Sequence, residues 1–315
     1  MIQARHFTKK RIFSPMLPVM GFLQLAGRLG YGLPALKWFF RNQEKHEAKK
    51  KVFGDYSPTE HDVIVATYSK SGTNWALQIC QQLAFHGEAE FGHIHDIVAW
   101  PEAPMPGVIP LRDTTPQELS PTGLRVIKTR LSAEYVPFSE KAKYITVIRD
   151  PKEVIISGYK FFLGVFGLLD YVPFEQWFDS YFSEDGPGKH WARHTASFWE
   201  LRERDNVLVM TYNDLQRDST SRIREIAELM GLSPSEEVFA KVFEKSSFSY
   251  MKEHESRFGP PHFPLVKKRA KMLRKGKSGK TGELLSPEQQ QKIDDYAQQE
   301  LASLNSDFPY KAFFL

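Results

Sequence analysis

A short apolar run followed by a loop of small polar residues is the feature that most constrains the fold. Residues 63–65, Val-Ile-Val, lead into residues 66–75, Ala-Thr-Tyr-Ser-Lys-Ser-Gly-Thr-Asn-Trp, where an amphipathic stretch opens. This order predicts a buried strand, a tight loop and the start of a helix. Amide groups without intrahelical partners, the helix dipole and the Lys70 ammonium together form a cradle for a phosphate group.

The order of residues in this loop differs from a Walker A motif. In that motif a Gly and four further residues precede Gly-Lys-Ser/Thr. Here Lys70 comes before Ser71-Gly72-Thr73, and no second Gly-Lys follows. A Ser/Gly turn between a strand and a helix also occurs in proteins that bind no phosphate, so the other motifs of the chain decide the interpretation.

A second strand and helix are predicted in residues 143–159. The alternating run at 144–148 indicates a buried strand, and Pro151 suits the first turn of a helix. Arg149 therefore stands at the carboxyl end of a strand, where open α/β sheets bind ligands. Its planar guanidinium suits a phosphate, although an ion pair with a neighbouring acid at the helix start is the alternative.

These two segments resemble motifs of the cytosolic sulfotransferase family. The loop at 66–75 is similar to the family's 5′-phosphosulfate loop, with Ser69 in place of a Pro, and residues 143–159 are similar to its 3′-phosphate segment. Residues 267–280 hold eight Lys or Arg among fourteen positions and include a stretch similar to the family's Arg-Lys-Gly-x-x-Gly motif. The chain then departs from the family's Asp-Trp-Lys, and a basic run alone is also typical of a solvated face or a polyanion site.

The resemblance implies a P-loop-like α/β fold of three layers, with a central parallel sheet flanked by helices, as the alternation of strands and helices also predicts. Strands are expected near 62–68, 125–129, 143–148 and 207–212, and helices near 74–86, 152–162, 174–182, 190–204, 219–230 and 287–304. The donor implied by the resemblance is 3′-phosphoadenosine 5′-phosphosulfate (PAPS), with no metal required. The residues that match donor-binding positions are Lys70, Ser71, Gly72, Thr73, Asn74, Trp75, Arg149, Ser157, Tyr212, Ser246, Phe248, Arg274, Lys275 and Gly276.

The reaction implied by the resemblance is transfer of a sulfuryl group from PAPS to a hydroxyl or amine of a small molecule. Lys70 and Lys128 match the family's two lysines, which stabilise charge on the leaving phosphate oxygen. The family places its catalytic base in Lys-Thr/Val-His-Leu, but this chain has Arg130 at the His position. An arginine stays protonated in proteins and cannot serve as that base.

Three explanations for Arg130 remain open. In the first, another residue takes the proton, and His95, His93 and Glu102 are candidates because they lie in a segment that resembles the family's acceptor-side segment. In the second, the acceptor is an amine, a guanidine-like nitrogen or an acidic phenol that needs little help, and Arg130 binds an anionic acceptor group or the sulfuryl oxygens. In the third, the chain binds the nucleotide without transferring the sulfuryl group.

Two other functions are alternatives to sulfuryl transfer. An ATP-dependent phosphotransferase is disfavoured because the Walker A spacing fails and no strand-terminal Asp is placed to hold Mg²⁺. A nucleotide- or polyanion-binding protein without transfer activity would use the basic run at 267–280. The aromatic residues in 159–182 favour an aromatic or lipophilic acceptor, and the slight formal charge of +4 does not suggest a nucleic-acid partner.

The N-terminal part differs in composition from the rest of the chain. We expect residues 1–58 to form an apolar arm and a polar connector, and residues 59–315 to form the sulfotransferase domain. Residues 13–40 are mostly apolar, but Pro and Gly residues interrupt them and disfavour a membrane-spanning helix. They are interpreted either as an arm over the acceptor cavity or as an interfacial segment on a membrane. The single Cys80 excludes an internal disulfide and fits a cytoplasmic location, while the oligomeric state stays open.

Overall fold

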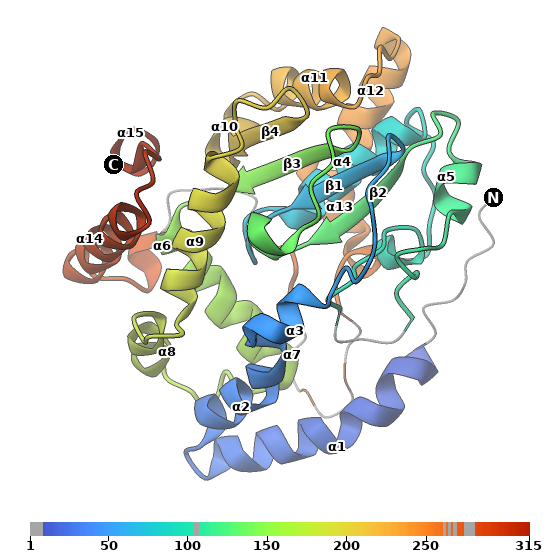
Figure 1. The fold of residues 1–315 in the computed structure, drawn as a ribbon. Coiled ribbons are helices and arrows are strands. Elements are labelled where there is room, and N and C mark those ends of the chain that lie inside the picture. Colours follow the sequence, from blue (N-terminus) through green and yellow to red (C-terminus); the bar gives the residue numbers. More distant parts are fainter. Residues whose placement is uncertain (1–8, 104–106, 261–262, 264–265, 267–269, 274–280) are drawn as a thin grey trace.

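In the part of the chain that the structure describes, four parallel strands form one sheet in the order β2-β1-β3-β4 (Figure 1). The strands are β1 Asp62–Ala66, β2 Arg125–Thr129, β3 Lys143–Ile148 and β4 Val207–Thr211. The computed structural model describes residues 9–103, 107–260, 263, 266, 270–273 and 281–315, so the predicted Arg274, Lys275 and Gly276 lie outside the described residues. The predicted α/β class with a parallel sheet is confirmed.

Helices connect the strands and extend the chain at both ends. The α-helices are α1 Lys9–Arg28, α2 Gly32–Glu44, α3 His46–Lys50, α4 Thr73–Ala84, α5 Thr115–Leu119, α6 Pro151–Gly158, α7 Gly164–Phe166, α8 Phe174–Tyr181, α9 Pro187–Trp199, α10 Tyr212–Arg217, α11 Ser219–Leu229, α12 Glu236–Lys245, α13 Phe248–Glu253, α14 Pro287–Ser303 and α15 Tyr310–Phe314. Short 3-10 turns lie at Ile94–Asp96, Ala133–Tyr135, Glu255–Arg257 and Thr281–Glu283, and a π-helical turn, η3, spans Tyr159–Leu163. Each predicted helix between 74 and 304 is present, with its ends shifted by a few residues.

The sheet is buried on both faces. Along β1, Val63 and Val65 belong to a core shared with α4, α11 and α12, whereas Ile64 and Ala66 belong to a core that includes Phe198 of α9. Alternate side chains of a strand point to opposite faces, and all five residues of β1 are buried. Helices therefore cover both faces, which gives the predicted three layers.

The strand order places two loops side by side. The chain leaves β1 and returns at β2 on one side of it, and then crosses to β3 on the other side. The carboxyl ends of β1 and β3 thus meet where the direction of winding changes. Open α/β sheets bind ligands at such a point, and the two predicted phosphate segments follow these two strands.

The single cysteine lies within the main core. Cys80 is a free thiol on α4 with no exposed surface. Burial raises the pKa of this thiol far above its ordinary value. Cys80 therefore behaves as a small apolar core residue rather than as a reactive nucleophile.

An N-terminal helical hairpin forms the end of the molecule opposite the sheet (Figure 1). Helices α1 and α2 bury Met20, Leu23, Leu33 and Leu36 against a cluster that includes Phe166. The sequence did not predict a continuous helix for α1, because two prolines interrupt it; burial of one face stabilises the helix despite that cost. Within the described residues, no helix has the length and apolarity needed to cross a bilayer.

Candidate active site

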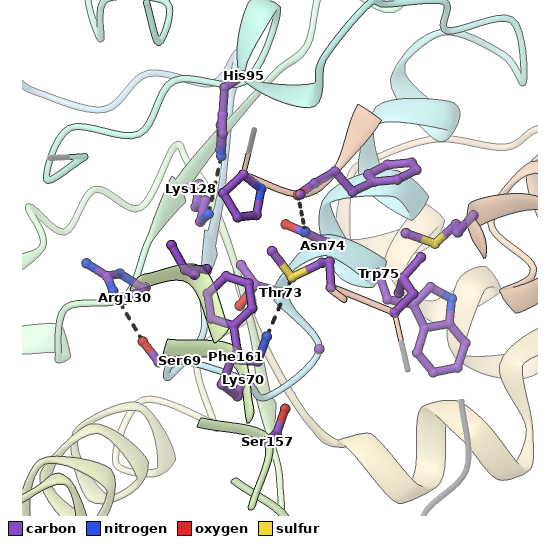
Figure 2. A pocket seen from close by; sticks show the side chains of 18 of the residues that line it. Ser69, Lys70, Thr73, Asn74, Trp75, His95, Lys128, Arg130, Ser157 and Phe161 are labelled. Carbon is purple, nitrogen blue, oxygen red and sulfur yellow. Dashed lines mark hydrogen bonds between the residues drawn. The ribbon is translucent and has the colours of Figure 1, made fainter. Parts of the chain in front are cut away.

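A cavity of about 520 Å³ opens at the carboxyl ends of the strands. Segments that follow β1, β2, β3 and β4 all contribute to its wall, and Figure 2 shows side chains from the loop after β1, from β2 and from α6 converging on it. Two predicted residues, Ser71 and Glu102, are not part of the lining. The predicted residues that line the cavity are Lys70, Gly72, Thr73, Asn74, Trp75, His93, His95, Lys128, Arg130, Arg149, Ser157, Tyr212, Ser246 and Phe248.

The loop after β1 has a left-handed backbone at two positions. Gly72, at φ 95°, is the N-cap of α4, and Lys70 has φ 69°. A Cβ atom at Gly72 would lie only 2.8 Å from Cδ2 of Tyr212, so both the backbone conformation and the close approach require glycine. The hydroxyl of Ser71 is buried and has no hydrogen-bond partner within the described residues. The first residues of α4, Thr73 and Asn74, line the cavity, and the first amides of a helix have no intrahelical partner.

Aromatic and sulfur atoms surround the ammonium of Lys70. Its Nζ lies 3.7 Å from the ring centroid of Phe161, on η3, and 3.5 Å from Sδ of Met272 (Figure 2). A cation over an aromatic face is stabilised by the ring quadrupole. The Lys70 charge is therefore held inside the cavity by residues from two other parts of the chain.

Arg149 joins the segments that follow β1 and β3. Its Nη1 donates to the carbonyl oxygen of Lys70 at 3.0 Å, and its Nε donates to Oε2 of Glu153 at 2.8 Å. The guanidinium carbon lies 4.3 Å from the ring centroid of Tyr212, which contacts Trp75 edge to face at 5.6 Å. The ion pair of Arg149 with a neighbouring acid, which was the alternative to a phosphate contact, is therefore present. It orients the Arg149 guanidinium, which also lines the cavity.

His95 and Lys128 form a buried pair in the cavity wall. Nδ1 of His95 lies 3.3 Å from the carbonyl oxygen of Val98, which can only accept, so this nitrogen carries the proton. Nε2 is then unprotonated, and it accepts from Nζ of Lys128 at 3.3 Å (Figure 2). Burial holds the pKa of His95 well below its usual range. Burial, assisted by the charge of Arg130, lowers the pKa of Lys128 to about 7.

Trp100 supports three polar side chains at once. The ring of His95 stacks on it at 5.1 Å, the Lys128 ammonium lies 3.6 Å from its centroid, and the Arg130 guanidinium lies 5.0 Å away. Trp100 was not among the predicted site residues. A Trp in this segment carries no local signal for such a platform, because its contacts with Lys128 and Arg130 arise only when Ala99 bridges to Ile127 of β2.

Arg130 is held by Glu102, outside the cavity lining, and by Ser69, within it. Its backbone N–H donates to Oε1 of Glu102 at 2.6 Å, and its Nε lies 3.8 Å from the same oxygen. Its Nη1 is 3.4 Å from Oγ of Ser69 (Figure 2). Glu102 thus lies behind Arg130 and orients it, while the guanidinium faces the cavity.

Other predicted residues use their polar atoms within the protein. His93 accepts from the amide of His95 through Nδ1 at 3.2 Å and donates through Nε2 to the Gly259 carbonyl at 3.1 Å, and burial lowers its pKa to about 4. The amide of Asn74 donates to the Phe258 carbonyl at 2.8 Å. These bonds connect the cavity wall to residues 258–259 and leave His93 no unpaired ring nitrogen.

The charged side chains described in the cavity wall are all positive. Among the described residues that line it, four side chains are cationic, Lys70, Lys128, Arg130 and Arg149, and none is a carboxylate. Such a wall suits a ligand with several negative charges. No group of three His, Cys, Asp or Glu in the described part of the chain is arranged to hold a metal ion, and metal-independent binding stays a prediction.

Apolar residues line the rest of the cavity. Phe161, Phe162 and Phe166 come from η3 and α7, and the N-terminal hairpin adds Met16, Phe39 and Phe40. The aromatic content of 159–182 had suggested such a wall, but the contribution of the hairpin depends on tertiary packing. A cavity with a cationic part next to an apolar part can hold an anionic group and an apolar group side by side.

Comparison with known proteins identifies the family. The profile described as "Sulfotransferase domain" matches residues 60–305. The chain therefore belongs to the sulfotransferase domain family, and it is a PAPS-dependent sulfotransferase with a small-molecule acceptor, as predicted.

Named relatives and solved structures agree with this assignment. The chain is 28% identical over 272 residues to sulfotransferase 2A1 of Macaca fascicularis, covering 85% of this chain and 94% of that protein. It is 25% identical over 258 residues to sulfotransferase 1C2 of Rattus norvegicus, covering 78% and 85%. Retinol dehydratase in complex with androsterone and the inactive cofactor PAP has a TM-score of 0.63 at 17% identity, over 82% of this chain and 85% of that one. A mouse sulfotransferase complexed with PAP has a TM-score of 0.60 at 22% identity, over 84% and 91%.

Proposed function

We propose that the protein transfers a sulfuryl group from PAPS to a hydroxyl group of a lipophilic small molecule, with His95 as the base that accepts the hydroxyl proton. The observation that carries this proposal is the unprotonated Nε2 of His95, which lies 3.3 Å from Nζ of Lys128 in the wall of the cationic cavity. A base and a cation that stabilises the leaving group are therefore adjacent.

The donor fits the charge of this cavity. The first turn of α4, Lys70 and Lys128 would hold the 5′ phosphosulfate, and Arg149 with Ser157 would hold the 3′-phosphate. The aromatic rings of Trp75, Tyr212 and Phe248 would contact the adenine, with Ser246 beside them, although its hydroxyl already donates to the Val242 carbonyl. The donor supplies an activated sulfuryl group. Arg274, Lys275 and Gly276, outside the described residues, remain predicted contacts to the 3′-phosphate.

His95 is the base candidate that the geometry favours. Glu102 is not in the cavity lining, and both ring nitrogens of His93 are hydrogen-bonded. Lys128 now donates to His95, and a charged acceptor attracts ammonium hydrogens more strongly than a neutral imidazole does. An anion next to Lys128 therefore makes Nε2 of His95 available to the acceptor hydroxyl. The first explanation for Arg130, that another residue takes the proton, is the one we adopt.

Arg130 has an electrostatic role in this proposal. Its orientation by Glu102 and Ser69 directs the guanidinium to the cavity, where it can donate to the sulfuryl oxygens. A fixed cation near charge that develops during transfer stabilises the transition state more than the ground state. The loss of the family's His at this position is thereby compensated by a base from another segment.

The acceptor is proposed to be aromatic or lipophilic. The cavity wall formed by Phe161, Phe162, Phe166, Phe39 and Phe40 supports this substrate class. Retinol dehydratase, which has a similar fold, is known in complexes with retinol and with androsterone, and both are lipophilic. An amine acceptor, which needs no strong base, and a nucleotide-binding protein without turnover remain outcomes of the test.

The proton-transfer role is tested with His95→Ala and two acceptors. General-base catalysis contributes about 10² to 10⁴ in rate, so turnover of an aliphatic alcohol should fall by at least about 100-fold. Turnover of an acidic nitrophenol, already ionised at neutral pH, should fall much less. Unchanged affinity for adenosine 3′,5′-bisphosphate serves as the control for folding. Equal losses on both acceptors would contradict the role of His95 as a base.

The 3′-phosphate assignment is tested with Arg149→Lys. This variant keeps a positive charge beside Glu153 but removes the planar fork. Affinity for adenosine 3′,5′-bisphosphate should fall about 10-fold or more, the value of a charge-assisted hydrogen bond, whereas affinity for AMP should change little. Titration calorimetry of both nucleotides measures the difference, and an equal loss for both would refute the assignment.

A further inference from the structure

The outer face of the N-terminal hairpin carries an unusual share of exposed apolar surface. Twelve large hydrophobic side chains are exposed within the described residues, and six of them lie between residues 17 and 38. Their exposed fractions range from 36% to 66%. We call these six residues the hairpin face: Leu17, Phe22, Leu25, Leu29, Tyr31 and Trp38.

These side chains form one surface. Phe22 and Leu25 are three residues apart on α1, so they project from the same side of that helix, and Leu29 follows in the turn just after Arg28. Trp38 of α2 contacts Phe22 with a centroid distance of 6.1 Å and an interplanar angle of 62°. The exposed apolar side of α1 is therefore in contact with Trp38 of α2, while the opposite side of the hairpin is buried in the protein.

The charge of this region is entirely positive. Every one of the 38 acidic residues of the chain lies at or after Glu44, and residues 1–43 contain only basic charges. Arg28, Lys37 and Arg41 are exposed on the two helices that carry the hairpin face. The basic residues of this segment are Arg5, Lys9, Lys10, Arg11, Arg28, Lys37 and Arg41.

This combination indicates which kind of surface covers the hairpin face. A second copy of the chain would bring two sets of positive charges together, which disfavours association between copies. An anionic bilayer surface attracts Lys and Arg, and Trp, Tyr, Phe and Leu side chains insert at the boundary between head groups and acyl chains. Helices too short or too polar to span a bilayer lie in its plane.

We propose that the hairpin face binds peripherally to the surface of an anionic lipid bilayer. The same hairpin places Met16, Phe39 and Phe40 in the cavity wall, so docking brings the apolar part of the cavity close to the lipid. A lipophilic acceptor dissolved in the bilayer then has a short path to the site. This consequence rests on the proposed function, whereas membrane binding itself does not.

Vesicle flotation tests the binding of the full-length protein. The vesicles contain phosphatidylcholine and phosphatidylserine at a 7:3 ratio, with pure phosphatidylcholine vesicles for comparison. Leu25→Glu and Trp38→Glu should each abolish most of the binding, because they place a negative charge in the buried part of the contact. Leu119→Glu, at a residue 48% exposed on α5, is the matched control and should bind as the wild type does.

Separate variants test the electrostatic contribution to membrane binding. A basic residue near an anionic membrane contributes about 1 kcal/mol, which is about a fivefold change in partitioning. Arg28→Gln and Lys37→Gln should each weaken binding by about that factor, and added salt should weaken it further. Lys311→Gln, an exposed position on α15, should have no effect.

Three results would overturn the proposal. One is wild-type flotation no greater than that of Leu25→Glu, and another is equal binding to neutral and anionic vesicles. The third is a dimer, detected by light scattering, that Trp38→Glu dissociates while vesicle binding is absent. Flotation needs neither donor nor acceptor, so failure of the proposed function would appear separately, as absent turnover of a soluble phenol by the wild type.

Discussion

Nucleotide binding should take up a proton at Lys128. The pKa of this side chain is lowered to about 7 by burial and by the charge of Arg130, so above pH 7 the amine is largely neutral in the free protein. An anion in the cavity favours the charged form and raises this pKa. The form of the protein with a protonated Lys128 therefore binds the nucleotide more tightly. Above pH 7, binding is accompanied by uptake of a proton from the solvent.

The magnitude follows from linkage between protonation and binding. When a group must be protonated for binding, affinity falls about tenfold for each pH unit above its pKa in the free protein. Between pH 7.5 and 9.5 the affinity for adenosine 3′,5′-bisphosphate should fall by about 100-fold, or about 2.7 kcal/mol. The pKa values of His93 and His95 are lowered from their ordinary value, so these rings stay neutral over this range. The second ionisation of a phosphate, near pH 6, is also complete.

Titration calorimetry at several pH values, in buffers of different ionisation enthalpy, measures both the affinity and the proton uptake. Lys128→Arg is the matched variant, because arginine keeps its charge throughout this range. Its affinity should be independent of pH from 7.5 to 9.5, with no proton uptake. A wild-type affinity that does not change over this range, or a Lys128→Arg variant with the same slope as the wild type, would refute the reasoning.

Two further predictions concern stability and are measured by urea denaturation. Gly72→Ala should lower the free energy of unfolding by at least about 1 kcal/mol more than Gly231→Ala does. Both glycines have a positive φ, but only a Cβ atom at Gly72 meets another side chain, Tyr212, at 2.8 Å. Equal losses of stability would show that this contact is relieved without cost. Asp62→Ala should destabilise the fold by about 3–5 kcal/mol, because it leaves the buried Arg125 without the carboxylate that lies 2.7 Å from its Nε. A loss below about 1 kcal/mol would contradict this view of the pair.

Local sequence patterns predicted the sheet and the phosphate loops well. The run at 63–65 and the alternating run at 144–148 are β1 and β3, and Pro151 does begin α6, after the N-cap Asp150. These features are local, since apolar periodicity, a proline and a capping residue each act within one turn or strand. Arg149 was correctly placed at a strand end for the same reason.

Features that depend on tertiary contacts could not be predicted in this way. Helix α1 forms in spite of its prolines because its inner face is buried, which propensity alone does not reveal. The sequence offered His95, His93 and Glu102 together as bases, and only the hydrogen bonds of the folded chain distinguish them. Trp100 acquires its role from Lys128 of β2 and from Arg130, which follows that strand.

Chemical labelling of the buried Cys80 can report how often the fold around α4 opens. It is the only thiol in the chain and lies on the helix that begins at the phosphate loop. A thiol reagent can therefore modify the folded protein only when α4 becomes exposed, and the modification rate at equilibrium measures the free energy of that opening. A nucleotide that binds the closed form should slow the labelling by a factor of one plus its concentration divided by its dissociation constant. A colorimetric thiol assay could thus rank nucleotides by affinity before any acceptor is known.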